Sequence, residues 1–391
     1  MGGRRLSATG PSPGGHPGVT REGHGGAMHT RTPLALSLSL SASVAALAAL
    51  AVGAPATASA PDDVAHVAVL GDTPYGPEQT EQFPALVDDV NAHGFDWVLH
   101  AGDVKSGSTP CSDELLATSR ALYDTFEAPF VLTPGDNEWT DCHREKAGQY
   151  LPTERLEHTR ALFYPNPRGT IGGRSMEVVP QSAEQPEHAQ SVENVRFHAA
   201  GTTFATVHVV GSQNGEAPWD ELAEGDHPAE RMAEVRQRRA ANLDWIDAAF
   251  DTAQERGDAA VAIMMQAEPV AGEPGYAAER ALLLERAAAF DGPVLLLHGD
   301  EHQHEEEAHY GGVQNLTRVE TFGDTATQWL SMTVDPSTEE VFSFRTHEVG
   351  QDGPIVDTGV ASGPDASPWA GLAGLGLVAA GGTLVARNRR A

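Results

Sequence analysis

The chain has 391 residues, of which 40% are hydrophobic, and 55 aspartates and glutamates against 25 lysines and arginines give a formal net charge of -30 at pH 7. The hydrophobic content allows at least one full-sized core and excludes a chain that is disordered throughout. The negative charge repels polyanions at long range, which excludes nucleic acids and anionic lipid surfaces as natural partners.

Residues 1–58 are interpreted as a leader and an export signal. A Gly/Pro-rich start is followed by a weakly basic stretch over 28–31 and an apolar run over about 33–52. Small residues of the A-x-A type follow, and they predict cleavage by signal peptidase after Ala58. An uncleaved N-terminal membrane helix is the alternative.

Short apolar runs alternate with helical patterns over 62–348, which predicts βα units and a largely parallel sheet. Strands are predicted at 65–70, 97–101, 130–133, 203–210, 259–265 and 294–297, and helices at about 83–90, 115–126, 153–163, 228–256 and 277–290. A Gly/Pro/Gln-rich excursion to about residue 191 is expected at the surface. Three strands without intervening helices, at 316–322, 329–334 and 341–345, predict an antiparallel completion of the sheets.

The C-terminal region is interpreted as a tether and a membrane anchor. Residues 349–368 are rich in Gly, Pro, Asp and Ser, and residues 369–386 form an apolar, uncharged run that three arginines follow directly. By the positive-inside tendency, the body over 62–348 then lies outside the cytoplasm and meets the membrane only through the segment at 369–391. A disordered tail is the alternative.

Cys111 and Cys142 are the only cysteines. In an exported chain two cysteines usually pair, so a disulfide is expected, with two buried free thiols as the alternative.

One pattern occurs four times: an apolar strand that ends in Gly-Asp. The four aspartates are Asp72, Asp103, Asp136 and Asp300. A single aspartate of this kind is usually a turn or capping residue. Because residues beyond the carboxyl ends of parallel strands converge on one crevice, four such carboxylates would repel one another unless cations neutralise them. The sequence therefore predicts a metal site.

These blocks, together with Gln266 after a strand and the Gly299–His302 segment, resemble the five-block signature of calcineurin-like metallophosphoesterases over about residues 64–344. The resemblance implies a four-layer αββα sandwich with mixed sheets, two metal ions, and hydrolysis of a small phosphorylated substrate by metal-activated water. Carried over, Asp72 and His302 bind the first metal and Asp103 bridges, whereas Asp136, Gln266 and Asp300 bind the second.

The blocks also differ from the family pattern. Aspartate or glutamine stands at three ligand positions where the family has asparagine or histidine, namely Asp136, Gln266 and Asp300; Pro74 stands at the histidine of the first block, and Asn137 at the catalytic histidine. Oxygen ligands favour Mn²⁺ or Mg²⁺, with Ca²⁺ or iron as alternatives, over Zn²⁺. The place of the missing first-block histidine is left to water, a backbone oxygen or Tyr75.

Because Asn137 is not an acid, another group must protonate the leaving oxygen, and His143 is the first candidate and His298 the second. Arg144 and Asn214 are candidate phosphate contacts. A structural or hydrogen-bonding role is the alternative for each histidine.

Two other functions remain open. One is a degenerate surface protein that binds metal or phosphate without turnover. The other, a serine hydrolase, is disfavoured because the sequence contains no G-x-S-x-G elbow.

Overall fold

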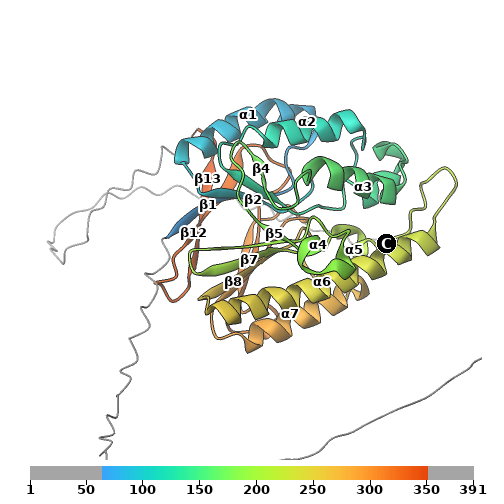
Figure 1. The fold of residues 1–391 in the computed structure, drawn as a ribbon. Coiled ribbons are helices and arrows are strands. Elements are labelled where there is room, and N and C mark those ends of the chain that lie inside the picture. The colour runs from blue at the N-terminus through green and yellow to red at the C-terminus, as the bar shows by residue number, and fades with distance from the viewer. Residues whose placement is uncertain (1–63, 351–391) are drawn as a thin grey trace, which may run out of the picture. The chain divides into compact units, whose positions relative to one another are not determined.

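The computed structural model describes residues 64–350, so the signal and anchor interpreted at the two ends, and nearly all of the tether, lie outside the described residues. Two sheets pack face to face, with α1, α2 and α3 over one outer face and α6 and α7 over the other (Figure 1). The four-layer arrangement with mixed sheets is thereby confirmed.

The first sheet has the spatial order β13 (Phe342–Glu348), β12 (Gln328–Val334), β1 (Ala65–Leu70), β2 (Trp97–His100), β3 (Pro129–Leu132) and β4 (Ile171–Gly172). The second has the order β10 (Glu305–Ala308), β11 (Leu316–Glu320), β9 (Val294–His298), β8 (Ala260–Met264), β7 (Thr202–Thr206), β6 (Val195–Ala199) and β5 (Val179–Pro180). The helices are α1 (Gly76–His93), α2 (Asp113–Tyr123), α3 (Pro152–Phe163), α4 (Gln181–Glu184), α5 (Gly211–Asn214), α6 (Pro228–Arg256) and α7 (Ala277–Ala289).

Side chains alternate between two cores along each central strand. In β1, Val67 and Val69 belong to the core between the sheets, whereas Ala68 and Leu70 pack with the helices above. From Val67 to Leu70 both faces of the strand are covered, which is why this part is a continuous apolar run rather than an alternating one. The predicted helix at 228–256 has these same bounds in the structure, with Trp245 among the side chains that it buries against the second sheet.

The expectation of an antiparallel completion is wrong for one of the three final strands. β11 pairs parallel with β9, while β12 is antiparallel to both β1 and β13. The difference arises from an additional strand, β10, which was not predicted and which pairs with β11. Its Glu305, Glu306 and Glu307 are exposed, so β10 can lie only at the sheet edge, and β11 returns between it and β9.

The excursion before residue 191 links the two sheets. It contributes β4 to the edge of the first sheet and β5 to the edge of the second. β6 was also missed, although it forms a hairpin with β7 through Ala200 and Gly201, both at positive φ.

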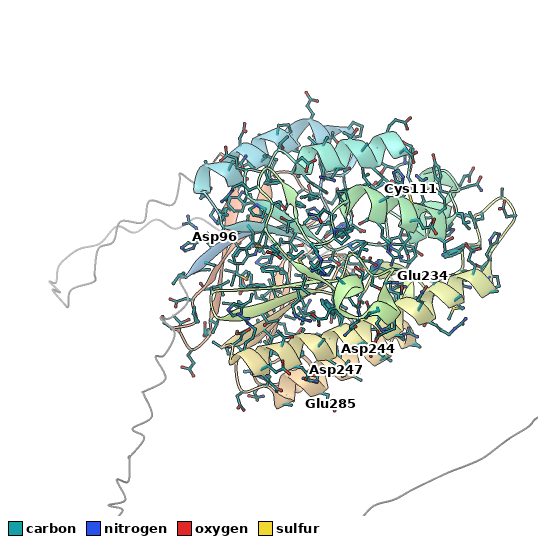
Figure 2. The ribbon with its side chains drawn as sticks, viewed as in Figure 1. Asp96, Cys111, Glu234, Asp244, Asp247 and Glu285 are labelled. Carbon is teal, nitrogen blue, oxygen red and sulfur yellow. A yellow bond between two sulfur atoms is a disulfide. The ribbon has the colours of Figure 1, made fainter. Side chains whose placement is uncertain are left out.

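Much of the acidic surface lies on the outer helices. Asp244 and Asp247 of α6 and Glu285 of α7 lie on the side turned away from the sheets (Figure 2). None of the helices between residues 64 and 350 combines the length and the apolar character needed to cross a bilayer.

Candidate metal centre

The centre is built where strands of both sheets end. β1, β2 and β3 run parallel, so the segments that follow them emerge at one edge of the first sheet. Asp72, Asp103 and Asp136 lie in those segments, and Asp300 follows β9 of the second sheet. The amide of Asp72 donates to the carbonyl oxygen of Gly102 over 3.0 Å, which ties the first two segments together.

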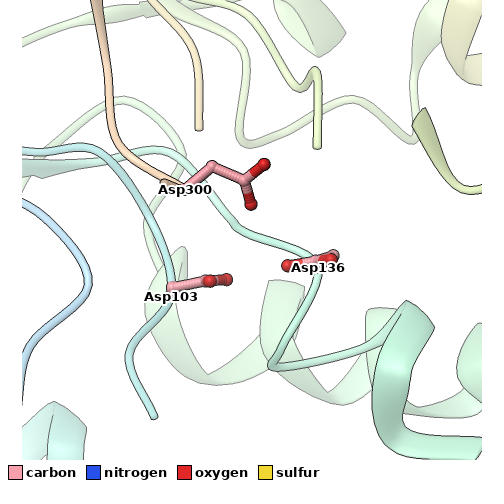
Figure 3. A group of neighbouring side chains, drawn as sticks. All are labelled: Asp103, Asp136 and Asp300. Atoms are coloured by element: carbon pink, nitrogen blue, oxygen red, sulfur yellow. The ribbon is translucent and has the colours of Figure 1, made fainter. Parts of the chain in front are cut away.

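Asp103, Asp136 and Asp300 converge. Each has a carboxylate oxygen within 4.8 Å of the other two, around a common space (Figure 3). Asp103 is 2% exposed and Asp136 6%. Burial, followed by repulsion from Asp136, raises the pKa of Asp103 well above its usual range, and the same two causes raise the pKa of Asp300.

A divalent cation fits this cluster. Buried carboxylates are costly unless they are protonated or paired with positive charge, and one cation among three of them removes the repulsion at once. The donor atoms are all oxygens, which is the set that Mn²⁺, Mg²⁺ and Ca²⁺ accept in proteins.

The backbone at three of the four aspartates is left-handed, with φ of 53° at Asp72, 58° at Asp103 and 82° at Asp300. L-residues rarely adopt this region, although aspartate and asparagine do so more readily than most. Such strain persists only where the surrounding structure enforces it, and it clusters at functional sites.

Asp72 lies beside this cluster with its own neighbours. It is fully buried, and its carboxylate accepts the amide of Asp300 over 3.2 Å. The Nε2 atom of His302 lies 3.5 Å from Asp72 Oδ1, and the hydroxyl of Tyr75 also lies 3.5 Å from that oxygen. A Cβ added at Gly323 would fall 2.5 Å from the His302 ring and 2.8 Å from the Cβ of Asp72, so only glycine leaves room for this pair.

Gln266 holds Asp300 in place. Its amide nitrogen donates to Asp300 Oδ1 over 2.6 Å, and its oxygen accepts the amide of Gly211 over 2.7 Å. In this arrangement the oxygen that was expected to bind metal is turned to the backbone. Gly211 itself approaches so closely that a Cβ there would lie 2.5 Å from Asp136 Oδ2 and 2.7 Å from Asp300 Oδ1.

Sequence reasoning missed Ser212 and Asp141. The hydroxyl of Ser212 is 3.0 Å from Asp136 Oδ2 and 2.6 Å from Asp141 Oδ1, and Asp141 forms a 2.5 Å ion pair with Arg144. Burial, with repulsion from Asp136, raises the pKa of Asp141 to about 8. A signal for Ser212 was present, because Val210-Gly211-Ser212 repeats the arrangement of an apolar run followed by glycine and a polar residue.

Asn137 contacts the cluster directly. Its side-chain nitrogen donates to Asp103 Oδ2 over 2.6 Å, and its backbone amide donates to Asp103 Oδ1 over 3.1 Å. Asn137 therefore fixes the orientation of the carboxylate at the middle of the site.

Among residues 64–350, no hydrogen bond or ion pair links either of the two histidines considered as acids to Asp103, Asp136 or Asp300. His298 is buried, with Nδ1 2.8 Å from the carbonyl oxygen of Gly299 and Nε2 3.1 Å from Arg318, and burial lowers its pKa to about 4. His143 is also buried, and burial together with Arg144 lowers its pKa. The acidic groups that act on it, Asp220, Glu221 and Asp226, belong to another loop.

Asn214 has a structural position rather than a place in the site. Its side chain donates to the carbonyl oxygen of Gly275 and to Glu279, and it accepts from Arg238 over 2.5 Å. These contacts anchor the left-handed turn that carries Ser212, whose φ is 52°.

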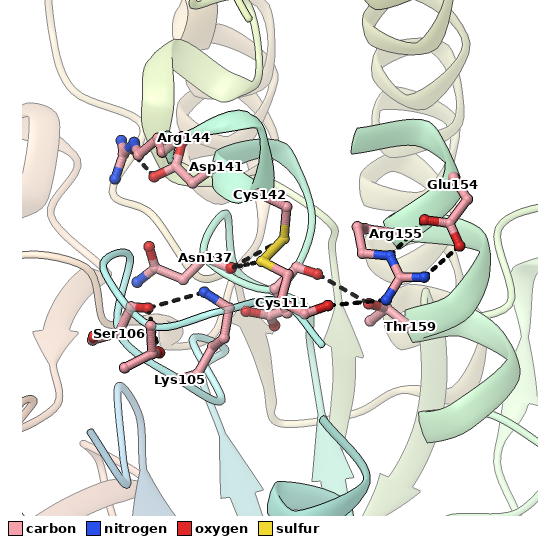
Figure 4. Close-up of a disulfide and its surroundings, with 12 residues drawn as sticks. Lys105, Ser106, Cys111, Asn137, Asp141, Cys142, Arg144, Glu154, Arg155 and Thr159 are labelled. Atoms are coloured by element: carbon pink, nitrogen blue, oxygen red, sulfur yellow. Dashed lines mark hydrogen bonds and ion pairs between the residues drawn. A yellow bond between two sulfur atoms is a disulfide. The ribbon is translucent and has the colours of Figure 1, made fainter. Parts of the chain in front are cut away.

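The expected disulfide between Cys111 and Cys142 is confirmed (Figure 4). It joins the segment after Asp103 to the segment after Asp136. Both sulfur atoms lie near the carbonyl oxygen of Asn137, at 3.5 and 3.6 Å. The bridge therefore pins the backbone that presents two of the three converging carboxylates.

Reduction of this bridge should lower the free energy of unfolding by about 3 to 4 kcal/mol, because the two cysteines are 31 residues apart and the open loop regains chain entropy when unfolded. Urea denaturation with and without a phosphine reductant, at saturating Mn²⁺, measures the difference. Coincident unfolding curves would contradict it.

The sequence model of the calcineurin-like phosphoesterase family matches residues 65–304, well over half of the chain. The chain belongs to the calcineurin-like phosphoesterase family. None of the curated proteins matches the sequence significantly.

The solved structures to which the chain is similar include a nucleotidase and a phosphatase. A 5'-nucleotidase from Candida albicans SC5314 has 10% identity and a TM-score of 0.41, with the match covering 74% of this chain and 52% of that one. The purple acid phosphatase PPD1 from yellow lupin (Lupinus luteus) seeds has 10% identity and a TM-score of 0.36, covering 73% and 54%. The chain thus spans about half the length of each.

Proposed function

We propose that this protein is an extracytoplasmic metal-dependent phosphoesterase that hydrolyses an ester of a small phosphorylated molecule. The convergence of Asp103, Asp136 and Asp300 in a member of this family is the observation that carries the proposal. With a formal net charge of -30, the chain itself repels an anionic substrate at long range. Recognition of phosphate then depends on the few positive groups at the site.

Two metal positions are assigned to the residues of the centre. Asp72, Asp103 and His302 would hold one cation, and Asp103, Asp136 and Asp300 the other. When bound, Mn²⁺ or Mg²⁺ supplies Lewis-acid activation of the phosphate and of the attacking water. Gln266, Asn137 and Ser212 orient the carboxylates through the hydrogen bonds described above.

Arg144 is positioned to bind the phosphate. Its side chain is 40% exposed, and the ion pair with Asp141 and a 3.4 Å contact with Ser212 hold the guanidinium near Asp136. A guanidinium offers paired donors that match two phosphate oxygens.

Replacing Arg144 with alanine should raise KM for a phosphate monoester about 10-fold, because one charge-assisted contact to the substrate contributes about 1.5 kcal/mol. Steady-state kinetics at saturating Mn²⁺ would show this. Arg256→Ala is a matched control, because Arg256 lies at the end of α6 with a side chain that is 47% exposed. A KM unchanged in Arg144→Ala, or raised equally in both variants, would contradict the assignment.

The proposed function is tested with protein that lacks residues 1–58, loaded in turn with Mn²⁺, Mg²⁺, Ca²⁺ and Fe²⁺. Chromogenic phosphomonoesters and phosphodiesters should be hydrolysed with at least one metal, and a chelator should abolish the activity. Turnover that persists at full rate after metal removal would refute the proposal.

A second candidate, a binding protein without turnover, is favoured by one observation. In the described part of the chain neither His143 nor His298 forms a hydrogen bond or ion pair with the three converging aspartates, and Asn137, which is not an acid, contacts Asp103 instead. Tight binding of metal without hydrolysis of any ester in the panel would support this candidate.

The extracytoplasmic location and the four-part organisation are also proposed, with a signal at 1–58, a phosphoesterase domain at 62–348, a tether at 349–368 and an anchor at 369–391. The disulfide supports export, since such bridges persist in oxidising compartments. Protease accessibility of the domain on intact cells that express the full chain tests this.

A further inference from the structure

His100 is the last residue of β2 and stands three positions before Asp103. It is fully buried, and its ring packs against those of Tyr123 and Phe130, with 4.9 and 5.6 Å between ring centroids. Both of these neighbours belong to the apolar core under α1 and α2. A polar ring in such a core is costly unless its nitrogen atoms have hydrogen-bond partners. The partners of the imidazole therefore indicate what it does.

Both ring nitrogens of His100 contact backbone next to an aspartate of the centre. Nδ1 lies 3.2 Å from the amide nitrogen of Gly102, the residue before Asp103. Nε2 lies 3.1 Å from the carbonyl oxygen of Thr73, the residue after Asp72. An amide only donates and a carbonyl only accepts, so Nδ1 is the acceptor and Nε2 carries the hydrogen. Burial lowers the pKa of His100 to about 4, which agrees with this neutral form.

These contacts act on a strained part of the backbone. Asp72 and Asp103 are left-handed, with φ of 53° and 58°, and Gly102 has φ of 93°. Conformations of this kind persist only where the surrounding structure enforces them. The carbonyl oxygen of Gly102 accepts the amide of Asp72 over 3.0 Å, and the amide of Gly102 donates to the imidazole. His100 thus fixes the turn that joins the two aspartate loops.

The two contacts of His100 are not equally replaceable. The carbonyl oxygen of Thr73 also accepts the hydroxyl of Tyr123 over 2.7 Å, so it keeps a donor when the imidazole is removed. The amide of Gly102 is buried, and within residues 64–350 its acceptor is Nδ1. Loss of the imidazole leaves this buried donor unpaired, which is the costlier of the two changes. His100 therefore acts mainly through Gly102.

We propose that His100 is a positioning residue of the metal centre, which fixes the directions of the Asp103 and Asp72 carboxylates through the backbone of Gly102 and Thr73. The inference rests on the metal centre of the proposed function and extends it to a side chain behind the carboxylates. A group that orients metal ligands contributes to metal affinity although it does not bind the ion.

Three substitutions of His100 separate its two contacts. Phenylalanine keeps a ring and removes both hydrogen bonds. Asparagine places an oxygen near the position of Nδ1 and keeps the bond from Gly102, whereas glutamine places a donor nitrogen near the position of Nε2 and keeps only the bond to Thr73. Tyr164→Phe is the matched control, because it removes one hydrogen bond to the carbonyl oxygen of Leu132, at the end of β3.

Isothermal titration of the full chain with Mn²⁺ tests the proposal. His100→Phe should weaken binding about 10- to 100-fold, as is usual when a group that orients metal ligands is removed. His100→Asn should restore most of the lost affinity and His100→Gln less of it, while Tyr164→Phe should match wild type. Urea denaturation in the presence of a chelator gives the stability of each variant, so a loss of affinity is distinguished from a loss of stability.

Unchanged Mn²⁺ affinity in His100→Phe would overturn the proposal. An equal loss of affinity in Tyr164→Phe would do the same, because it would show a general loosening of the fold. If His100→Phe does not fold, the other two variants decide, since equal affinities of His100→Asn and His100→Gln would contradict a role through Gly102.

The inference and the proposed function fail separately. Wild type that hydrolyses esters while His100→Phe binds Mn²⁺ normally refutes only the inference. Wild type that hydrolyses nothing, with an Mn²⁺ affinity that follows the expected order among the variants, refutes only the phosphoesterase function. Wild type that does not bind Mn²⁺ refutes the inference together with the manganese centre on which it rests.

Discussion

Asp103→Asn should lower kcat/KM at least about 100-fold, which corresponds to about 2.7 kcal/mol of transition-state stabilisation. Asp103 lies at the centre of the site, within reach of Asp136 and Asp300 on one side and of Tyr75 on the other. Asparagine keeps the shape and removes the charge, so both proposed metal positions weaken together. Steady-state kinetics over a range of Mn²⁺ concentrations measures the effect.

The same substitution should raise the stability of metal-free protein and reduce the stabilisation that metal provides. In metal-free protein Asp103→Asn removes a carboxyl group whose pKa is raised by burial and by neighbouring carboxylates, and with it the free energy that folding loses by raising that pKa, so the melting temperature should rise. With Mn²⁺ present, the variant should gain less from the ion than wild type. Glu285→Gln, on the exposed side of α7, should match wild type in all measurements (Figure 2). Equal activity of Asp103→Asn and wild type would contradict the central place given to Asp103.

Metal-free protein should lose stability as pH rises from about 5.5 to 8.5. Burial and nearby carboxylates raise the pKa of Asp141 to about 8, and burial raises the pKa of Glu138 to about 7. Folded pKa values above the unfolded ones mean that the folded state holds these protons while the unfolded state has released them. The stability present at low pH is therefore lost as pH passes through the folded values.

The loss should be about 2 kcal/mol or more in the free energy of unfolding, and Mn²⁺ at about 100 times its Kd should restore about 2.7 kcal/mol at the higher pH. Urea denaturation of chelator-treated protein at pH 5.5 and 8.5, with and without Mn²⁺, gives all four values. Equal stability at the two pH values without metal would contradict this prediction. It would show that the repulsion among the acidic side chains is relieved in another way.

Much of the architecture could be read from the sequence because its central strands are buried on both faces. Such strands are continuous apolar runs, and β1, β2, β3 and β9 each end in the same glycine and aspartate pattern, which identified the carboxylates. The direction of β11 could not be read, since it depends on β10, whose three glutamates give no strand signal.

The hydrogen bonds that orient the carboxylates of the site were harder to predict from the sequence. Ser212 and Gln266 reach Asp136 and Asp300 from α5 and from the end of β8, across gaps of 34 to 76 residues. Hydrogen bonds over such separations leave no local period or spacing in a sequence. From the sequence, Tyr75 was one of three possible substitutes for a missing histidine, and in the structure its hydroxyl lies 3.1 Å from Asp103 Oδ2.

The left-handed backbone at Asp72, Asp103 and Asp300 restricts how these positions can change. Glycine, asparagine and aspartate tolerate this region best, so asparagine is the replacement that keeps the local chain path at least cost and still offers an oxygen. Divergence within the family can thus remove charge from the centre one residue at a time while the scaffold stays intact. A short mutational route then separates an enzyme from a protein that only binds its former substrate.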